Sequence, residues 1–362
     1  MLTLKGAADK VFKHMFPSGH TYTVESVTSG HPDKVCDQMA DAILDELLRQ
    51  DPMTRAGIEL MGSHNLLAIG GEVTTTAKVD YEAIARKVYK DIGYTDTLTV
   101  VTNVAQQSPD IAQGVDTGGA GDQGIMYGFA TDETPEMLPL GVVLAHTLAR
   151  GLEYLRRNDP QFAWLRPDGK TQVTIEDGKV TRVLVSCQHD EKVSQEQIRA
   201  LLIEHLIKPA IGSLEGIEVL TNPTGSFVIG GFTADTGLTG RKLMVDTYGG
   251  VAPHGGGAFS GKDATKVDRS ASYMCRQAAK YLVANGHAKK ALVSVAYAIG
   301  RAEPLMISAV NEKGEDLSVI IKQHYDFKPK AIIERLNLRR PIYKPTAVYG
   351  HFGKAELPWE QV

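Results

Sequence analysis

Hydrophobic residues recur at every third or fourth position over several stretches of the chain, and this spacing predicts amphipathic helices. The clearest stretch runs from 34 to 49, where the regularly spaced apolar residues are Val35, Met39, Ile43 and Leu47. Pro32 fits the first turn of this helix. Similar patterns predict helices at 80–92, 136–157, 194–207 and 268–284, and a helical stretch from Leu317. The 194–207 helix should stop before Pro209, because proline does not continue a helix.

Short apolar runs between the helices predict strands, at 66–73, at 98–104 and near Val293 and Met306. The segments QVTIE and KVTRVLVS flank Asp177-Gly178, a strong signal for a two-residue hairpin turn. Because hairpins are mixed with helices, the pattern favours an α+β fold, with sheets packed by helices on one face, over a doubly wound parallel sheet. Three comparable blocks of helices and strands are visible along the chain.

Length and charge narrow the classes of protein further. The 362 residues predict two or three domains, and 39 Lys and Arg against 43 Asp and Glu give a net charge of -4. No global basic field favours nucleic acid or a membrane surface, and no apolar run is long enough to cross a bilayer. Residues 1–20 carry three lysines and are predicted to be a short extension rather than a signal peptide. The three isolated cysteines favour a cytoplasmic protein.

The most glycine-rich segment, GGVAPHGGGAFSGKDATK at 249–266, could let backbone amides approach a phosphate closely. Its residues 256–262 match the start of a Walker A loop, but Asp263 stands where that loop needs a hydroxyl. A flexible surface loop is the alternative interpretation. Four cations fall within a short stretch here, which suits a polyphosphate better than solvated surface charge does: Arg241, Lys242, Lys262 and Lys266.

A second candidate site lies at the predicted start of the 34–49 helix, in the sequence GHPDK. A helix N-terminus favours anions, His31 can donate to a phosphate oxygen, and Asp33 can hold Mg²⁺. The alternative for His31 is a purely structural helix cap. Asp37, Asp41 and Asp45 continue at four-residue steps; a solvated acidic face is favoured over a ladder of metal ligands, and no role is assigned to them.

Eight motifs in one order resemble the S-adenosylmethionine synthetase (methionine adenosyltransferase) family: GHPDKVCDQ, GGEVTT, QQSPDI, GAGDQG, LRPDGKTQV, NPTGSFVIGG, GLTGRK and GGGAFSGKD. The resemblance covers about 22–360. It implies three intertwined, similarly built α/β domains with pseudo-threefold symmetry. It also implies a transferase that forms S-adenosylmethionine from ATP and L-methionine by sulfur attack on the ribose 5′ carbon, and then hydrolyses the triphosphate to phosphate and pyrophosphate.

The resemblance assigns roles position by position. Charge on the triphosphate would be stabilised by His31, Lys170, Arg241 and Lys262. ATP would also be bound by Asp168, Ser226, Phe227, Asp235, Lys242 and Ala258. Methionine would be bound by Glu72, Gln107, Asp122, Asp235 and Lys266. Asp33 and Asp268 would hold Mg²⁺, with two ions per site expected, and Glu59 would be the acid linked to K⁺.

The same resemblance implies a homotetramer built as a dimer of dimers, with active sites between subunits. It implies an extension at 1–20, an N-terminal domain at 21–118, a central domain at 119–229 and a C-terminal domain at 230–362. The loop from Gln107 would be a mobile gate, and its 116–121 part is shorter than in many bacterial members. Pro253, which precedes His254, stands where many relatives carry Arg.

Two other functions remain open at this point. A P-loop-like nucleotide phosphohydrolase is suggested by residues 256–262, although Asp263 counts against it. A non-catalytic ATP-binding sensor would share the phosphate-binding residues without the reaction. Because no matched site position is substituted, a non-catalytic protein of this kind is disfavoured.

Overall fold

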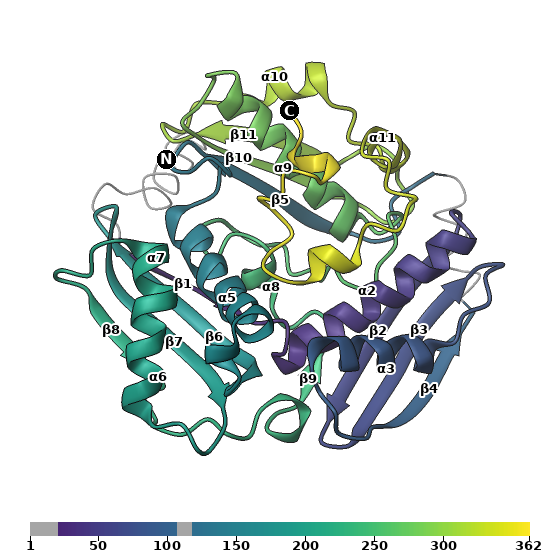
Figure 1. Cartoon of the computed structure of the whole chain (residues 1–362). Helices are drawn as coiled ribbons and strands as arrows, with labels where there is room; N and C mark the ends of the chain where they lie inside the picture. The colour runs from purple at the N-terminus through teal and green to yellow at the C-terminus, as the bar shows by residue number, and fades with distance from the viewer. Residues whose placement is uncertain (1–20, 107–117) are drawn as a thin grey trace, which may run out of the picture.

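The computed structural model describes residues 21–106 and 118–362. The predicted extension at 1–20, and Gln107 with most of the predicted gate, lie outside this range. In the described part of the chain the strands form three sheets, each with its own helices, arranged around a common centre (Figure 1). Strands and helices are mixed along the chain, which confirms the predicted α+β class.

The first sheet has the strand order β1-β6-β7-β8. Its strands are β1 (Tyr22–Val27), β6 (Leu165–Glu176), β7 (Lys179–His189) and β8 (Glu218–Thr221). Helix α5 (Leu140–Asn158) packs on β1 and β6. The predicted hairpin is confirmed: Asp177 and Gly178 form the β6–β7 turn, and both have positive φ angles, 50° and 74°, as a two-residue turn of this type requires.

The helix predicted at 194–207 continues further than expected. It consists of α6 (Gln195–Leu202), a π-helical turn η2 (Ile203–Ile207) and α7 (Lys208–Ile211), so it runs past Pro209. Proline lacks an N–H and its ring clashes with the carbonyl one turn back. The wider π turn just before Pro209 relieves both problems, and the expectation that the helix stops there was wrong.

The second sheet has the order β4-β3-β2-β9, in which β2 and β3 are antiparallel and β3 and β4 parallel. Its strands are β2 (Arg55–Ser63), β3 (Leu66–Thr74), β4 (Thr99–Ala105) and β9 (Gly237–Leu238). Helices α2 (Pro32–Gln50) and α3 (Tyr81–Ile92) belong to this unit. Gly93, with a φ of 118°, ends α3 in the left-handed conformation that favours glycine.

The third sheet has the order β11-β10-β5 and is covered by the long helix α9. Its elements are β5 (Gly124–Thr131), α9 (Val267–Ala284), β10 (Lys290–Tyr297) and β11 (Met306–Asn311). Shorter helices are α8 (Leu243–Asp246), α10 (Ser318–His324) and α11 (Pro329–Arg335). Single 3-10 turns are η1 (Pro160–Phe162), η3 (Gly231–Thr233), η4 (Lys344–Ala347) and η5 (Pro358–Glu360).

Each sheet draws strands from distant parts of the chain. Strand β1 lies in the sheet of β6 to β8, β5 lies beside β10, and β9 extends the sheet of β2 to β4. The three units are therefore intertwined. The division of the sequence at 118 and 229 remains a prediction about segments of the chain.

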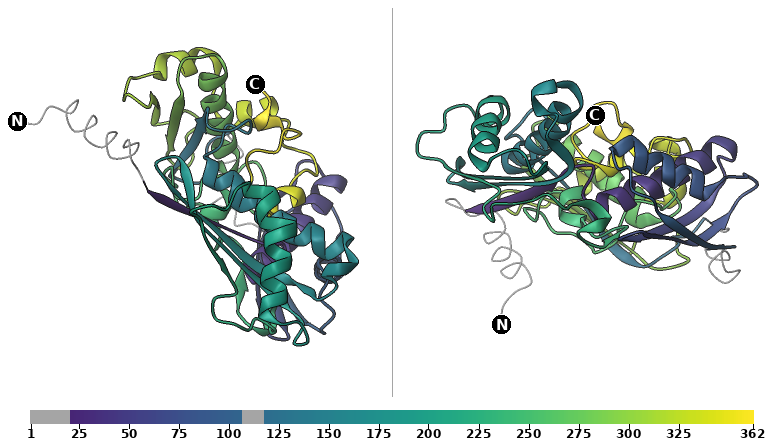
Figure 2. Two further views of the ribbon diagram at one scale, coloured as in Figure 1. Left: turned by 60° about the vertical axis from the view of Figure 1, so that its left-hand side comes forward. Right: turned by 60° about the horizontal axis from the view of Figure 1, so that its bottom comes forward.

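The helices gather on one side of the molecule and leave the other faces of the sheets uncovered (Figure 2). In β2, Ala56, Ile58 and Leu60 are buried on the helix side. The alternate residue Met61 is 37% exposed, and Val101 of β4, in the same cross-strand row, is 53% exposed. Alternation of buried and exposed residues is expected of a sheet with one covered face.

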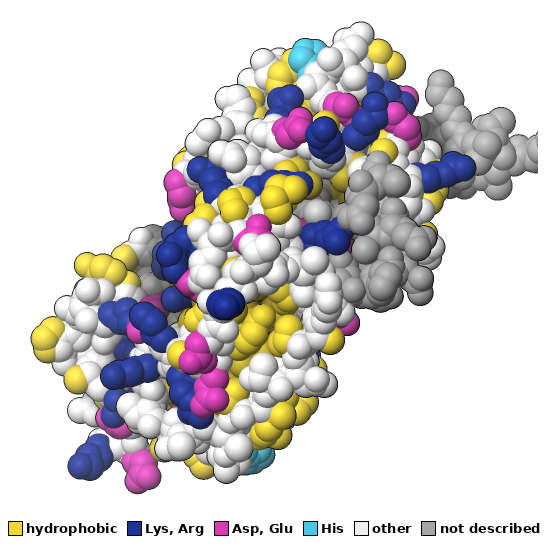
Figure 3. Space-filling view, turned by 90° about the vertical axis from the view of Figure 1, so that its right-hand side faces the viewer, with side chains coloured by type: hydrophobic (Ala, Val, Ile, Leu, Met, Phe, Trp, Pro, Cys, Tyr) yellow, Lys and Arg dark blue, Asp and Glu magenta, His cyan; other side chains and the backbone are white. Residues whose placement is uncertain are grey.

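Charged side chains of both signs are interspersed with hydrophobic ones over the side that Figure 3 shows, and no single basic field dominates it. None of the helices in the described part of the chain is long and apolar enough to span a membrane. The cysteines Cys36, Cys187 and Cys275 are buried free thiols.

His146 is a buried histidine that links α5 to β1 and makes stability depend on pH. Its Nδ1 lies 2.8 Å from the Ser26 hydroxyl oxygen, and burial lowers the pKa of His146 from 6.5 to about 3. The unfolded chain therefore binds a proton below about pH 6.5 that the folded chain does not bind. We expect this residue to lower the free energy of unfolding by about 2 kcal/mol between pH 7 and pH 5.

Urea unfolding of the wild type and of His146→Gln at both pH values measures this effect. The variant should lose about 2 kcal/mol less between the two pH values, whatever its stability at pH 7. Exposed His287 provides the control, because His287→Gln should keep the wild-type difference. An unchanged difference in the His146 variant would show that His146 already titrates normally in the folded chain.

Candidate active site

The start of α2 carries the first group of predicted site residues. His31 is the N-cap of α2: its Nδ1 accepts a hydrogen bond of 3.2 Å from the Asp33 backbone N–H, and Pro32 occupies the first turn. Burial, reinforced by the charges of Lys242 and Lys170, lowers the pKa of His31 to about 3. The ring is therefore neutral at pH 7. Because Nδ1 accepts, the proton resides on Nε2, which is left as a hydrogen-bond donor.

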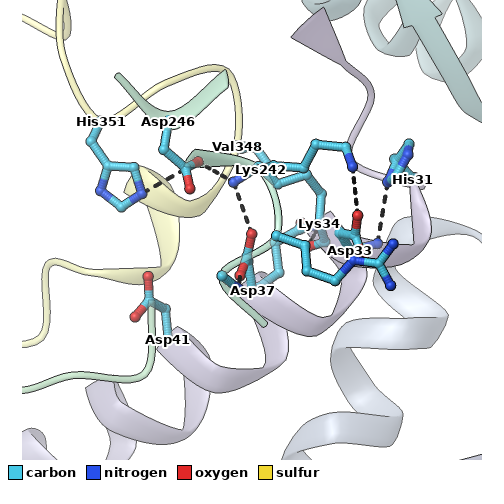
Figure 4. A network of polar contacts seen from close by, with 12 residues as sticks. His31, Asp33, Lys34, Asp37, Asp41, Lys242, Asp246, Val348 and His351 are labelled. Carbon is cyan, nitrogen blue, oxygen red and sulfur yellow. Dashed lines mark hydrogen bonds and ion pairs between the residues drawn. The ribbon is translucent and has the colours of Figure 1, made fainter. Parts of the chain in front are cut away.

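Asp33, in the first turn of α2, contacts cations that come from a distant part of the chain. Its Oδ2 accepts 2.6 Å from Lys242 Nζ (Figure 4). Its Oδ1 accepts 2.9 Å from the Leu238 backbone N–H and lies 3.6 Å from Arg241 Nε. Burial alone would raise the pKa of Asp33, but these hydrogen bonds and the neighbouring cations lower it below its usual value. The structure thus joins residues 209 positions apart in sequence.

The β6 strand brings a second group next to the first. Val27 pairs with Lys170, and the Thr28 backbone N–H donates 3.0 Å to the Gly169 carbonyl, so β6 lies beside the segment that leads to His31. Lys170 is exposed. Asp168 is buried, which raises its pKa to about 6, and its Oδ2 accepts 2.9 Å from the Gly231 backbone N–H.

The segment 226–235 borders this second group. The Phe227 backbone exchanges hydrogen bonds with His189, accepting from its N–H at 2.9 Å and donating to its Nε2 at 3.1 Å. Ser226 and Asp235 are exposed. The charge of Asp235 contributes to the raised pKa of Asp168, after burial, which is the main cause.

The glycine-rich segment carries the third group, and its backbone is anchored rather than free. Asp263 Oδ1 accepts 2.9 Å from the Ala56 N–H and 2.6 Å from Lys266 Nζ. Lys262 Nζ donates 2.6 Å to Asp268 Oδ2, at the start of α9. A Cβ on Gly240 would approach the Ala258 Cβ to 2.4 Å, so Ala258 lies against the turn that precedes Arg241.

The anchoring also bears on the P-loop alternative. The described residues 249–261 contain no strand leading into Gly261, and Asp263 is tied to β2 rather than open to a nucleotide-bound metal. These observations remove the structural context that a Walker A loop requires.

Glu59 and Glu72 lie exposed on the uncovered face of the second sheet. Glu72 is opposite Gly57, and Gly57 in turn bridges to Lys262, so Glu72 and this lysine lie in one cross-strand row. Asp122 is exposed just before β5. Among the described residues, no hydrogen bond or ion pair joins Glu59, Glu72 or Asp122 to His31 or Asp33.

The acidic ladder of α2 differs from the sequence interpretation. Asp37 and Asp41 are fully buried, and Asp45 is partly buried, so the favoured solvated face was wrong. Burial is possible because Lys34 pairs with Asp37 and Arg269 pairs with Asp41. Over 21–106 and 118–362, no group of three or more His, Cys, Asp or Glu could hold a metal ion, so the ladder is not a ligand set either.

Family models of S-adenosylmethionine synthetase match the chain in three consecutive parts: the N-terminal domain at 19–109, the central domain at 117–227 and the C-terminal domain at 229–361. The chain belongs to the S-adenosylmethionine synthetase family. As a member, it is an enzyme that forms S-adenosylmethionine from ATP and methionine. The family uses divalent metal ions.

Individual relatives match this sequence over nearly their whole length. The chain is 52% identical to an S-adenosylmethionine synthase of Pseudothermotoga lettingae, over 94% of this chain and 96% of the relative. It is 50% identical to that of Desulforudis audaxviator, over 95% and 96%, and 49% identical to that of Mesoplasma florum, over 94% and 97%. The fold expected of an S-adenosylmethionine synthetase, three α/β units, is the one described above.

Proposed function

We propose that the chain catalyses direct attack of the methionine sulfur on the ribose 5′ carbon of ATP at the start of α2. The observation that carries this site is the convergence of His31 and Asp33 with Lys242, which lies 209 positions further along the chain than Asp33. A thioether sulfur is already nucleophilic and carries no proton, so no general base is needed. The site must instead stabilise the departing triphosphate.

The charge that develops on the triphosphate would be met by His31, Lys170, Arg241 and Lys262. Support comes from the Nε2–H donor of His31 at the N-terminus of α2, where the helix dipole also favours anions. The charge of Lys170 reaches the His31 ring, and Arg241 lies beside Asp33. Lys262 is held by Asp268, and ATP would have to recruit it from that carboxylate. Hydrolysis of the triphosphate to phosphate and pyrophosphate would use the same cations.

The remaining substrate contacts follow from the same layout. The nucleoside and phosphates of ATP would be bound by Asp168, Ser226, Phe227, Asp235, Lys242 and Ala258. The zwitterion of methionine needs both charges matched: Glu72 and Asp235 suit its ammonium group, and Lys266 or Gln107 suits its carboxylate. Asp122 is assigned to the same site by motif resemblance. Gln107 lies outside the described residues.

Mg²⁺ and K⁺ are the metal ions that the residues suit. Asp33 and Asp268 are single hard-oxygen carboxylates on different elements, and Mg²⁺ typically binds one or two carboxylates together with substrate phosphates. When bound, Mg²⁺ would supply positive charge to the triphosphate oxygens. Lys242 pairs with Asp33, and Lys262 pairs with Asp268, so both carboxylates lie next to a positive charge. Two Mg²⁺ ions per site and K⁺ near the exposed Glu59 are proposed.

The assembled enzyme would be a cytoplasmic homotetramer, a dimer of dimers with active sites between subunits. The uncovered sheet face supports this proposal, because it exposes Glu59 and Glu72 together with Met61 and Val101. A second copy over this face would bury the apolar residues and enclose the acids. The buried free cysteines are compatible with a reducing compartment.

One assay distinguishes the proposed reaction from its alternatives. The chain is incubated with ATP, Mg²⁺ and K⁺, with and without L-methionine, while sulfonium product and phosphate are followed. We expect product with methionine, and efficient phosphate release only when methionine is present. Phosphate release that ignores methionine would indicate a nucleotide phosphohydrolase, and neither product would indicate a sensor.

Asp235 provides a sharper test of the methionine assignment. Asp235→Asn keeps the shape of the side chain but removes the charge that would face the ammonium group. We expect the KM for methionine to rise about tenfold, and the KM for ATP to rise less. Steady-state kinetics with each substrate varied measures both, with exposed Asp132→Asn as the control. Equal rises in the two constants would contradict the assignment.

A further inference from the structure

Asp33 and the three aspartates of the acidic ladder lie on one face of α2. These four side chains, the rungs, hold loops from distant parts of the chain. They are spaced one turn apart, so their side chains lie on the same face of the helix. Each accepts backbone hydrogen bonds from a different place: Asp33 from Leu238 at 2.9 Å, Asp37 from Gly240 at 2.8 Å, Asp41 from Gly261 at 2.8 Å, and Asp45 from Tyr343 and Lys344, both at 2.8 Å. Gly240 and Gly261, which donate to Asp37 and Asp41, immediately precede Arg241 and Lys262.

Asp41 makes the most extensive contacts of these rungs. Its two carboxylate oxygens accept 2.7 and 2.8 Å bonds from the guanidinium of Arg269, and both side chains are 0% exposed. Arg269 also donates 3.1 Å to the carbonyl of Lys262. The pair therefore holds the backbone on both sides of the Lys262 side chain, through the Gly261 N–H and the Lys262 carbonyl.

Gly261 shows how closely this backbone is fitted. Its φ is +83°, and a Cβ at this position would lie 1.9 Å from the Ile58 carbonyl oxygen. The Ile58 N–H also donates 3.0 Å to the Gly261 carbonyl. The loop thus packs against β2 on one side and is hydrogen-bonded to Asp41 on the other. These contacts restrict the backbone position of Lys262.

Neither Asp41 nor Arg269 can contact a substrate, because both are completely buried. A buried ion pair contributes little net stability compared with well-packed apolar residues of similar size. The pair is therefore better explained by its contacts than by stability. It holds the backbone of Lys262, a cation assigned to the triphosphate.

We propose that Asp41, through Arg269, is a positioning residue for Lys262, and that the pair sets the place of the Lys262 ammonium group in the reaction. This rests on the proposed function, which assigns Lys262 to the departing triphosphate. A displacement of about 1 Å in such a group can reduce a rate about a hundredfold. The pair therefore acts on the chemical step more than on the binding of methionine.

The test replaces the whole pair, since removing one partner alone would leave a buried charge. The variant Asp41→Leu/Arg269→Met is compared with the wild type for thermal stability, kcat and both KM values. We expect a folded protein whose kcat falls at least tenfold while the KM for methionine changes less than threefold. Asp45→Asn is the matched control: it lies on the same helix face but holds η4, and its kcat should stay within twofold.

A double-mutant comparison identifies the residue through which the pair acts. In a Lys262→Met background, the pair replacement should reduce kcat by less than threefold further, because its target is already gone. A folded pair variant with near wild-type kcat would overturn the inference, and so would a full additional loss in the Lys262→Met background. If the wild type itself forms no S-adenosylmethionine, the proposed function fails instead, and the two failures are distinguishable.

Discussion

Lys170→Met should reduce kcat for S-adenosylmethionine formation by about 10² to 10³, the usual cost of removing one preorganised charge from a transition state. Lys170 is exposed on β6, and its charge reaches His31, where the triphosphate is expected to depart. In the variant, the methionine side chain at position 170 has nearly the same length as lysine but lacks the ammonium group. Because the lysine is assigned to developing charge, binding of a non-cleavable ATP analogue should weaken much less than kcat falls.

The control for this variant is Lys179→Met, which removes an exposed lysine from the adjacent strand of the same hairpin. It should keep kcat within twofold. Single-turnover product formation and calorimetric titration with the analogue separate chemistry from binding. Turnover of Lys170→Met within threefold of the wild type would remove Lys170 from the catalytic group.

Glu360→Ala should destabilise the folded chain by about 3 to 5 kcal/mol, because it leaves buried cations without their counter-charge. Glu360 accepts 2.9 Å bonds from both the Nε and an Nη of Arg276, and a 3.0 Å bond from Lys280, all on the buried face of α9. Burial alone would raise the pKa of Glu360, but the two cations lower it below its usual value. The carboxylate is thus charged at pH 7, and removing it leaves Arg276 and Lys280 without a negative partner.

Exposed Glu356 offers a nearby comparison, and Glu356→Ala should change stability by less than about 0.5 kcal/mol. Urea unfolding at a fixed protein concentration measures both variants. A Glu360 variant as stable as the Glu356 variant would mean that the carbonyl oxygens around Arg276 compensate its charge on their own. Those carbonyls belong to Phe129, Met137 and Glu136.

Local patterns were sufficient to predict many elements. The four-residue spacing from Val35 to Leu47 predicted α2, and Asp177-Gly178 predicted the β6–β7 hairpin, because both signals depend only on neighbours in sequence. Strands β3 and β4 were predicted for the same reason. The helix predicted at 80–92 ends at the same residue as α3, Ile92.

Long-range partners could not be predicted in this way. The aspartates of α2 look alike in sequence, and only a partner 228 positions away shows that Asp41 is buried against Arg269. The pairing of Tyr22 with Ile175 likewise joins segments that no local pattern connects. Six candidate site residues, His31, Asp33, Arg241, Lys242, Lys262 and Lys266, were indicated by local patterns, and the others came from motif resemblance alone. Lys34, Asp37, Asp41 and Arg269, whose contacts are all long-range or buried, were assigned no role.

The interleaving of the three sheets has a consequence for the order in which the chain can fold during synthesis. Strand β1 must wait for β6, β5 must wait for β10, and β2 must wait for β9. No unit can complete its sheet while only its own third of the chain has left the ribosome. Such contacts slow folding and leave strand edges open to aggregation in the nascent chain. The three units should therefore become stable together and late, and an excised third should not fold by itself.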